Sequence, residues 1–512
     1  MSKAIIAAGH EATADAAARV IAEGGNAFDG LCAALCAATV AEPVLASLGG
    51  GGFLQAKPAG AAPMLIDFFV QTPRERAPTD GLDFYPILAD FGDTTQEFHI
   101  GLGAMATPGA IAGLFAIQRR LCRLSPAQLL EPARLLAKDG VVINPFQHRI
   151  ARIVEPILRA HPAVFARYAS QQDPARLAAP GERLHQNELA ESLATLGDTG
   201  AAIIHGGEWG DRLARDCARL GGHLRAADLA AYRVIERTPL AVPYRGTRLH
   251  LNPPPSIGGL LLGLTLDLLA STGPPVARFG SARHRHRLAT AMRLTQNART
   301  DIAAAASAGR GLDSALLAGY RALMADNAVF TRGTTQISIA DADGNLASLT
   351  LSNGEGAGYL LPGTGIMMNN MLGEQDLNPN GFHLWPTDRR ISSMMCPTLV
   401  EHADGGWTVT GSGGSNRIRS AILQVLCNLV DLGLPLADAV AAPRIHFEDG
   451  RLNVEPPIDE KVLHALARAW PDILVFRDRS VFFGGAHSVS IDARGKLDGA
   501  GDPRRGGVVR RV

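Results

Sequence analysis

The residues most suggestive of chemistry are a pair of threonines, Thr334 and Thr335, which follow Arg332 and Gly333 and directly precede a strand pattern. A threonine hydroxyl is a weak nucleophile unless a base lies beside it. Threonine also has a high β propensity, so a threonine at a strand start is more often structural than catalytic. Taken alone, the pair marks a candidate nucleophile and nothing more.

A second candidate site is the glycine turn at residues 411–415, which reads Gly-Ser-Gly-Gly-Ser. A short strand pattern at 408–410 precedes it, and a helix pattern follows, with apolar residues at 418, 422, 425, 426 and 429. Such a turn places backbone N–H groups at a helix N-terminus, where they can bind an anion.

Other familiar motifs are missing from the sequence. It contains no GxSxG, HExxH, CxxC or Walker motif. His284 and His286 are surrounded by arginines, which would repel a cation. We therefore expect neither a metal nor an organic cofactor.

The elements that must position these residues follow from periodicity. Residues 12–23 predict an alanine-rich helix ended by two glycines, and Asn26 predicts the cap of a second helix. Residues 337–339 and 348–352 alternate between apolar and polar, with turn residues at 341–345 between them. This pattern predicts a hairpin that starts at the threonine pair.

Composition limits the classes of function. The 512 residues carry 49 Lys and Arg against 49 Asp and Glu, so no basic excess favours nucleic acid. Hydrophobic residues make up 46%, enough for a buried core. We expect no membrane partner, since no apolar run reaches the ~18 residues of a spanning helix. No secretory pattern is visible, which favours a cytoplasmic location.

The segment 334–345 resembles the start of the small subunit in the gamma-glutamyltranspeptidase family, Thr-Thr-x-x-Ser-x-x-Asp-x-x-Gly-Asn. Further stretches resemble family signatures in the family's order along nearly the whole chain: 24–27, 49–53, 107–113, 131–133, 253–259, 369–370, 392–394, 411–415, 442–444 and 502–506. Each is weak alone, but the ordered set is specific.

The resemblance implies an N-terminal-nucleophile hydrolase that cuts itself between Gly333 and Thr334. Cleavage would free the Thr334 α-amine, whose pKa of about 7.7–8.0 suits a base at neutral pH. The implied fold is α+β, a four-layer αββα sandwich. Segments 1–333 and 334–512 would fold as one intertwined unit, a heterodimer of the two fragments. A higher oligomer built from this heterodimer is the alternative.

The resemblance also assigns catalytic roles by position. Gly413 and Gly414 match the paired glycines whose N–H groups form the oxyanion hole. Ser352 lies where the family often has a threonine that hydrogen-bonds the nucleophile.

Substrate-binding roles are implied in the same way. Ser392 and Ser393 match paired serines that hold a substrate carboxylate, although a plain turn remains an alternative. Asn353 lies near a substrate-binding asparagine, but the alignment there needs a one-residue gap.

Two positions depart from the family pattern. Phe69 stands where a glutamyl-binding arginine is expected, and this removes a bidentate carboxylate ligand. Glu374 is the one acid where the family has an Asn-Asn-Gln-x-Asp-Asp pattern. Catalysis therefore looks intact, whereas γ-glutamyl specificity does not.

The leading expectation is an enzyme that cleaves the amide of a small acylated molecule through an acyl-Thr334 ester, by hydrolysis or transfer. One alternative uses the same acyl-enzyme to hydrolyse a C–C bond of an activated ketone in a biosynthetic pathway. Another is a non-catalytic binding protein on the same fold.

Overall fold

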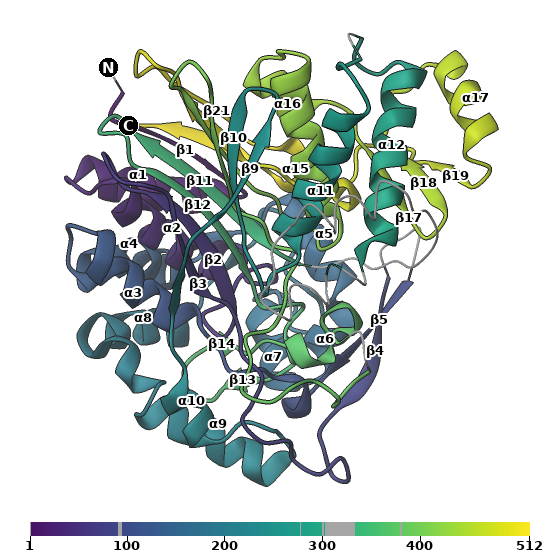
Figure 1. Ribbon diagram of the computed structural model, residues 1–512. Coiled ribbons are helices and arrows are strands. Elements are labelled where there is room, and N and C mark those ends of the chain that lie inside the picture. Colours follow the sequence, from purple (N-terminus) through teal and green to yellow (C-terminus); the bar gives the residue numbers. More distant parts are fainter. Residues whose placement is uncertain (1, 91–94, 277, 300–301, 303–332, 379–380) are drawn as a thin grey trace.

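Two β-sheets packed face to face form the centre of the molecule (Figure 1). The computed structural model describes all residues except 1, 91–94, 277, 300–301, 303–332 and 379–380. The 30 residues 303–332, which end with Arg332 directly before Gly333, thus lie outside the described part of the chain. Within that part, no helix has the length and apolar character needed to cross a membrane.

The larger sheet has seven strands, and each neighbouring pair is antiparallel. In spatial order they are β22 (Val508–Arg511), β1 (Ala4–Ala8), β11 (Thr335–Asp341), β12 (Leu346–Ser352), β2 (Gly51–Lys57), β3 (Met64–Phe68) and β8 (Ile235–Arg237). The hairpin predicted from the alternation is β11–β12, at the centre of this sheet.

The smaller sheet has six strands, also antiparallel throughout. Its order is β21 (Leu497–Ala500), β20 (Ser488–Ile491), β16 (Trp407–Thr410), β15 (Thr398–Glu401), β10 (Thr247–Leu251) and β9 (Leu240–Tyr244). Strands from before and after residue 334 occur in both sheets, so the two segments share one core.

Contacts between β1 and β21 and between β11 and β20 join the two sheets. At one end the layer between them is apolar, with Ile5, Leu399 and Val489 in one cluster. Towards Thr334 it becomes polar, and the buried side chains form a hydrogen-bonded ladder: Gln336, Ser338, Ser348, Thr350, Thr410 and Ser488. Because each of these groups has a partner, the polar layer is compatible with burial.

Helices cover both outer faces of the sandwich (Figure 1). The larger sheet is covered by α1 (Glu11–Ala22), α2 (Ala27–Ala41) and α3 (Ala110–Leu121), with α4 (Pro126–Asp139) and α8 (Asn187–Thr199) outside them. The smaller sheet is covered by α11 (Gly258–Ser271) and α16 (Leu436–Ala441), with α12 (Ala282–Asn297) and α15 (Arg417–Leu426) against them. This arrangement confirms the expected αββα sandwich of the α+β class.

The other described elements surround this core. The helices are α5 (Pro145–Ile153), α6 (Glu155–Arg159), α7 (Pro162–Tyr168), α9 (Glu208–Leu220), α10 (Ala226–Ala231) and α17 (Glu460–Ala469). The strands are β4 (Tyr85–Asp90), β5 (Thr95–Ile100), β6 (Val141–Val142), β7 (Arg183–Leu184), β13 (Leu360–Leu361), β14 (Ile366–Met367), β17 (Ile445–Glu448), β18 (Arg451–Val454) and β19 (Ile473–Val475).

Local sequence signals explain several element boundaries. The side chain of Asn26 accepts hydrogen bonds from the N–H groups of Phe28 and Asp29, and Asp29 accepts in turn from Asn26. This capping box starts α2 where the sequence predicts it.

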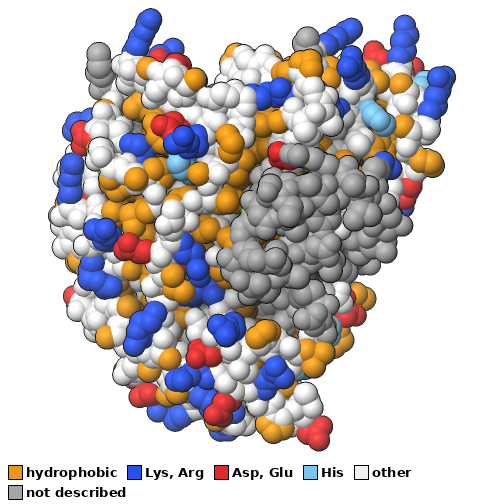
Figure 2. Space-filling model, viewed as in Figure 1, with side chains coloured by type: hydrophobic (Ala, Val, Ile, Leu, Met, Phe, Trp, Pro, Cys, Tyr) orange, Lys and Arg blue, Asp and Glu red, His pale blue; other side chains and the backbone are white. Residues whose placement is uncertain are grey.

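On the surface, acidic and basic side chains are interspersed over the face drawn in Figure 2, in keeping with the equal charge totals.

Candidate active site

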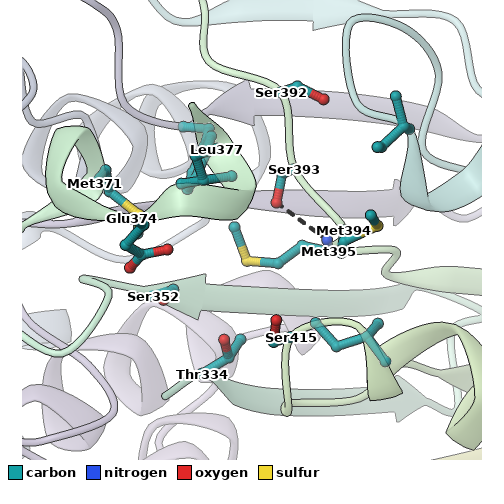
Figure 3. Close-up of a pocket in the computed structure, with 13 residues that line it drawn as sticks. Thr334, Ser352, Met371, Glu374, Leu377, Ser392, Ser393, Met394, Met395 and Ser415 are labelled. Atoms are coloured by element: carbon teal, nitrogen blue, oxygen red, sulfur yellow. Dashed lines mark hydrogen bonds between the residues drawn. The ribbon is translucent and has the colours of Figure 1, made fainter. Parts of the chain in front are cut away.

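Thr334 lies directly before β11 and is 3% exposed. Its side chain faces a small cavity of about 40 Å³ between the central sheets and the loops around them. In Figure 3, Thr334 and Ser415 lie on one side of this cavity, Ser392 and Ser393 lie on the opposite side, and methionine side chains lie between them. The tertiary structure therefore gathers residues that are far apart in the sequence around the predicted nucleophile.

Two hydroxyls converge on the carbonyl oxygen of Gly333, across the bond where cleavage is expected. The Thr334 hydroxyl donates to this oxygen at 2.7 Å, and the Ser352 hydroxyl donates to it at 2.7 Å as well. Ser352 ends β12, next to β11 in the sheet, and Thr335 pairs with Leu351 in that register. The hairpin thus brings nucleophile, scissile carbonyl and a second hydroxyl together.

Charged side chains hold the backbone on both sides of the same bond. The Gly333 N–H donates to Glu355 Oε1 at 2.5 Å, and Arg505 Nη1 donates to the Thr334 carbonyl at 3.0 Å. Burial lowers the pKa of Arg505 to about 10, although Asp502, Glu355 and Glu42 act in the opposite direction. No sequence motif indicates a role for Glu355, and Arg505 belongs to the family signature at 502–506.

Glu42 is a further buried acid beside the threonine pair. Its carboxylate accepts from the hydroxyl of Thr335 at 2.7 Å and from that of Thr13 at 2.8 Å. Burial raises the pKa of Glu42, while both hydroxyl bonds and the charge of Arg505 lower it. Thr335 therefore anchors the first residue of β11 to the end of α2, which fixes the position of Thr334.

The glycine turn at 411–415 lies against the backbone of Thr334, and its role as an anion site stays a prediction. An added Cβ at Gly413 would lie 2.1 Å from the Thr334 carbonyl oxygen, so only glycine fits there. In the uncut chain the Gly413 N–H donates to the Gly485 carbonyl at 3.3 Å. Gly414 has φ +117°, a conformation that side chains disfavour. The two glycines do not line the cavity themselves; Ser415 and Ile418 from the following turn and helix do.

The remaining cavity wall is largely apolar. Phe69 stacks on Phe53 with ring centroids 5.3 Å apart, and Phe69 is one of the residues that line the cavity. The other apolar lining residues are Ile257, Met371, Leu377, Met394, Met395 and Ile418. Thioether and aromatic side chains adapt to apolar groups of varied shape. Among the described lining residues Glu374 is charged, and none is Arg, Lys or His.

Known proteins resemble this chain in sequence and in fold. The family model described as Gamma-glutamyltranspeptidase matches residues 13–512. The chain belongs to the gamma-glutamyltranspeptidase family. It is 31% identical to an Acylase ACY 1 proenzyme from Pseudomonas sp. (strain V22), over 98% of this chain and 92% of that protein. It is 29% identical to the Glutathione hydrolase proenzyme of Escherichia coli (strain K12), over 95% and 87%.

A solved structure shows the same fold. The crystal structure of a cephalosporin acylase from Bacillus halodurans matches with a TM-score of 0.85 at 23% identity, covering 99% of this chain and 96% of that one. Membership of the gamma-glutamyltranspeptidase family confirms the sequence-based expectation of a hydrolase or acyltransferase enzyme on the N-terminal-nucleophile fold.

Arginines near the family's expected glutamyl-binding position do not reach the cavity of this family member. Arg390 lies behind Phe69, where it contacts the Phe69 carbonyl, the Tyr232 hydroxyl and Asp67. Arg417 lies 3.6 Å from Glu448 and against the Phe482 ring. In the described structure, neither arginine takes the place left by the missing guanidinium at Phe69.

The predicted substrate-binding serines and the lone acid do line the cavity. Ser393 Oγ accepts from the Met395 N–H at 3.1 Å, which fixes the serine rotamer. Ser392 Oγ is buried and has no hydrogen-bond partner in the described structure. Glu374 is 2% exposed. Their roles toward a substrate stay predictions.

Asn353 is the one predicted substrate-binding residue that the structure does not place in the cavity wall. Its Cα and Cβ lie 3.0 Å from the position of a Cβ added to Gly50, so its side chain packs against the glycine run before β2. Gly354 follows in a left-handed conformation with φ +67°, which redirects the chain after β12. A substrate-binding role for Asn353 stays a prediction, and its packing against the glycine run does not support that role.

No group of three or more His, Cys, Asp or Glu side chains in the described residues is arranged to hold a metal ion. The six cysteines are free, and the closest sulfur pair, Cys32 and Cys122, is 3.7 Å apart.

Proposed function

We propose that the chain cuts itself between Gly333 and Thr334, and that mature Thr334 hydrolyses or transfers the acyl group of a small amide with an apolar acyl body. One observation carries the proposal: the Thr334 and Ser352 hydroxyls both lie 2.7 Å from the Gly333 carbonyl oxygen, beside a cavity with apolar walls. The word proenzyme in the names of two relatives supports the processing step.

Self-cleavage is an N-to-O acyl shift. The Thr334 oxygen attacks the Gly333 carbonyl carbon, the hydroxyl proton passes to the amide nitrogen, and the C–N bond breaks to leave an ester. Ser352 donates to the oxygen that becomes negative in the tetrahedral intermediate. This break frees the Thr334 α-amine. Water then hydrolyses the ester, which releases the Gly333 carboxylate and returns a proton to the Thr334 oxygen.

The same groups serve turnover. The freed α-amine accepts the Thr334 hydroxyl proton as the oxygen attacks the substrate carbonyl, and it then protonates the leaving amine. Departure of Gly333 leaves the position of its carbonyl open to a substrate carbonyl. Water or a second amine attacks the acyl-Thr334 ester, and this choice separates hydrolysis from transfer.

Specificity follows from the cavity wall. A free glutamyl α-carboxylate would meet Phe69 and three methionines instead of a guanidinium. Each charge-assisted hydrogen bond is worth about 1.5–3 kcal/mol, so the loss of two corresponds to roughly 10²–10⁴ in kcat/KM. We therefore expect poor use of γ-glutamyl amides and better use of apolar acyl groups.

Steady-state kinetics on hexanoyl and γ-glutamyl p-nitroanilides test the proposal, with Thr334→Ala as the inactive control. The expected result is faster release of nitroaniline from the hexanoyl compound, with hexanoic acid as the second product by mass. A kcat/KM of about 10⁴ M⁻¹s⁻¹ or more on the γ-glutamyl compound would contradict the specificity argument, since that value is typical of a natural substrate. A ketone substrate cleaved at a C–C bond while amides stay intact would favour the alternative chemistry.

A further inference from the structure

Ser415 is a buried serine on the same side of the cavity as Thr334. It is 6% exposed, and its hydroxyl points into the cavity in Figure 3. Its backbone belongs to the glycine turn at 411–415, in which Gly413 packs against the Thr334 carbonyl. An acyl group on the Thr334 oxygen would therefore lie beside the Ser415 side chain.

The backbone of Ser415 is in a conformation that favours glycine. Its φ is +52°, and it lies between Gly414, with φ +117°, and Asn416, with φ −59°. The N–H of Arg417 donates to the Gly414 carbonyl at 3.0 Å and closes the turn. A positive φ followed by a negative one is typical of a type II′ turn, which prefers glycine at the first central position. Serine is therefore strained at a position where glycine would not be.

No structural contact of the Ser415 hydroxyl explains this strain within the described residues. A serine near a helix start commonly caps the helix, but the cap position of α15 is Asn416. Among these residues the Ser415 hydroxyl has no hydrogen-bond partner, whereas Ser393 Oγ accepts from the Met395 N–H. A buried hydroxyl without a partner costs free energy, and the backbone strain adds to this cost. Two costs at one residue beside a nucleophile indicate that the hydroxyl finds its partner during the reaction.

Acylation of Thr334 removes one donor from the reacting carbonyl. In the uncut chain the Gly333 oxygen accepts from the hydroxyls of Thr334 and Ser352. Once the Thr334 oxygen carries an acyl group it has no proton to donate, so of these two hydroxyls only that of Ser352 can still act. We propose that Ser415 is a further catalytic residue, whose hydroxyl donates to the substrate carbonyl oxygen as that oxygen becomes negative. The proton stays on Ser415, so no covalent bond of this residue forms or breaks.

The inference rests on the function proposed above and concerns turnover rather than self-cleavage. The Gly333 carbonyl is tethered to Thr334 by the peptide bond, and its oxygen accepts from Thr334 and Ser352. A substrate acyl group has no such tether and enters the cavity that Ser415 lines. Because every amide substrate has this carbonyl, Ser415 should act equally on different acyl groups.

Two variants separate the hydroxyl from the backbone. Ser415→Ala and Ser415→Gly both remove the hydroxyl, but only glycine suits the positive φ. We expect both chains to cut themselves to completion and to lose about 10- to 100-fold in kcat on hexanoyl and γ-glutamyl p-nitroanilide, with KM little changed. Ser415→Gly should nevertheless unfold at a higher urea concentration than Ser415→Ala. Ser490→Ala, at a half-buried position on β20, is the control and should keep the wild-type kcat.

The glycine variant decides between a catalytic and a structural role. If Ser415 serves only to shape the turn, glycine keeps the turn and turnover stays at the wild-type rate, which would overturn the proposal. A loss confined to KM, or to one of the two acyl groups, would also overturn it, because it would indicate contact with another part of the substrate. So would a folded Ser415→Gly chain that stays uncut, since Ser415 would then act on the bond between Gly333 and Thr334.

A boronic acid tests the same contact without turnover. Pentylboronic acid has the carbon chain of a hexanoyl group, with boron in place of the carbonyl carbon. The Thr334 oxygen bonds to boron and its proton passes to the α-amine, which gives a tetrahedral anion that resembles the reaction intermediate. We expect the Kd, measured by calorimetry on the cut chain, to rise by about 10- to 100-fold in Ser415→Gly and to stay unchanged in Ser490→Ala. An unchanged Kd in Ser415→Gly would count against the proposed contact and overturn it.

The outcomes also separate this inference from the proposed function. If the cut wild type binds pentylboronic acid but cleaves neither anilide, the amide chemistry fails, and the Kd of Ser415→Gly still decides the role of Ser415. If it cleaves an anilide but does not bind the boronic acid, the kinetics decide that role. If it does neither, both proposals fail, because Thr334 is then not a nucleophile.

Discussion

The Ser352 hydroxyl lies 2.7 Å from the Gly333 carbonyl oxygen. Ser352 is the last residue of the hairpin that begins with Thr335. Ser352 thus contacts the group that must become an oxyanion during self-cleavage. Its position depends on the antiparallel register of β11 and β12, in which Thr335 pairs with Leu351. A shift of one residue in this register would turn the serine to the other face of the sheet.

Replacement of the nucleophile should stop maturation without unfolding the chain. Thr334→Ala should remain a single folded chain, because the side chain removed is small and its one hydrogen bond runs to the preceding carbonyl. Wild-type protein should yield a small fragment of 179 residues (512 − 333), roughly 19 kDa, with Thr334 first by intact mass. Thr335→Ser is the control, since it keeps a hydroxyl for Glu42. A small fragment that starts at Thr335 would refute the assignment.

Loss of the Ser352 hydroxyl should slow self-cleavage. Removal of one oxyanion donor costs about 10²–10³ in rate in comparable acyl-transfer sites, and we expect Ser352→Ala to fall in this range. The rate is measured from the decay of the uncut band over time. Ser490→Ala, at a half-buried position on β20, should cut like the wild type. Unimpaired cleavage in Ser352→Ala would show that another group stabilises the oxyanion.

Substitution of Gly413 should impair folding and cleavage together. The added methyl of Gly413→Ala would lie 2.1 Å from the Thr334 carbonyl oxygen, so the backbone on one side must move. Overpacking of this kind costs about 1–3 kcal/mol and would displace the scissile bond. The control is Gly197→Ala in α8, where the nearest atom to the added carbon is 3.4 Å away. Urea unfolding and gel analysis should show a lower midpoint and slow cleavage for Gly413→Ala alone.

Stability should fall as the pH drops from about 6.5 towards 4, in part because of His487. Burial lowers the pKa of His487 to about 4; Arg505 and Arg444 also lower it, whereas Asp502 raises it. Its Nδ1 accepts from the Asp502 N–H at 3.1 Å, which requires the neutral ring. Between these pH values the unfolded chain binds the proton and the folded chain does not, so protonation favours unfolding.

The expected loss from His487 is about 2 kcal/mol between pH 7 and pH 5. Urea unfolding of the Thr334→Ala chain at both pH values measures it, and His487→Gln should weaken the pH dependence by that amount. His286→Gln, at an exposed position, should leave it unchanged. An identical pH dependence in His487→Gln would mean that other groups carry the effect.

Much of the local structure was predictable from the sequence. Alternation around residues 337–352 predicted the β11–β12 hairpin, and Asn26 predicted the start of α2, because both signals act between residues close in the chain. The glycine turn at 411–415 and the helix after it were predicted for the same reason, although α15 starts at Arg417 and the Gly413 N–H bonds to Gly485 in the uncut chain.

The ordered motifs of the sequence were enough to indicate the family, and the family resemblance in turn implied the αββα fold and the candidate nucleophile Thr334. Only the folded chain shows which side chains surround Thr334. It placed Ser392, Ser393, Glu374 and three methionines in one cavity and packed Asn353 outside it. It also brought Glu355 to the Gly333 N–H, a contact that no motif indicated. A site made by loops from two sheets depends on strand register and on packing between residues far apart in the sequence. A local sequence pattern does not contain this information.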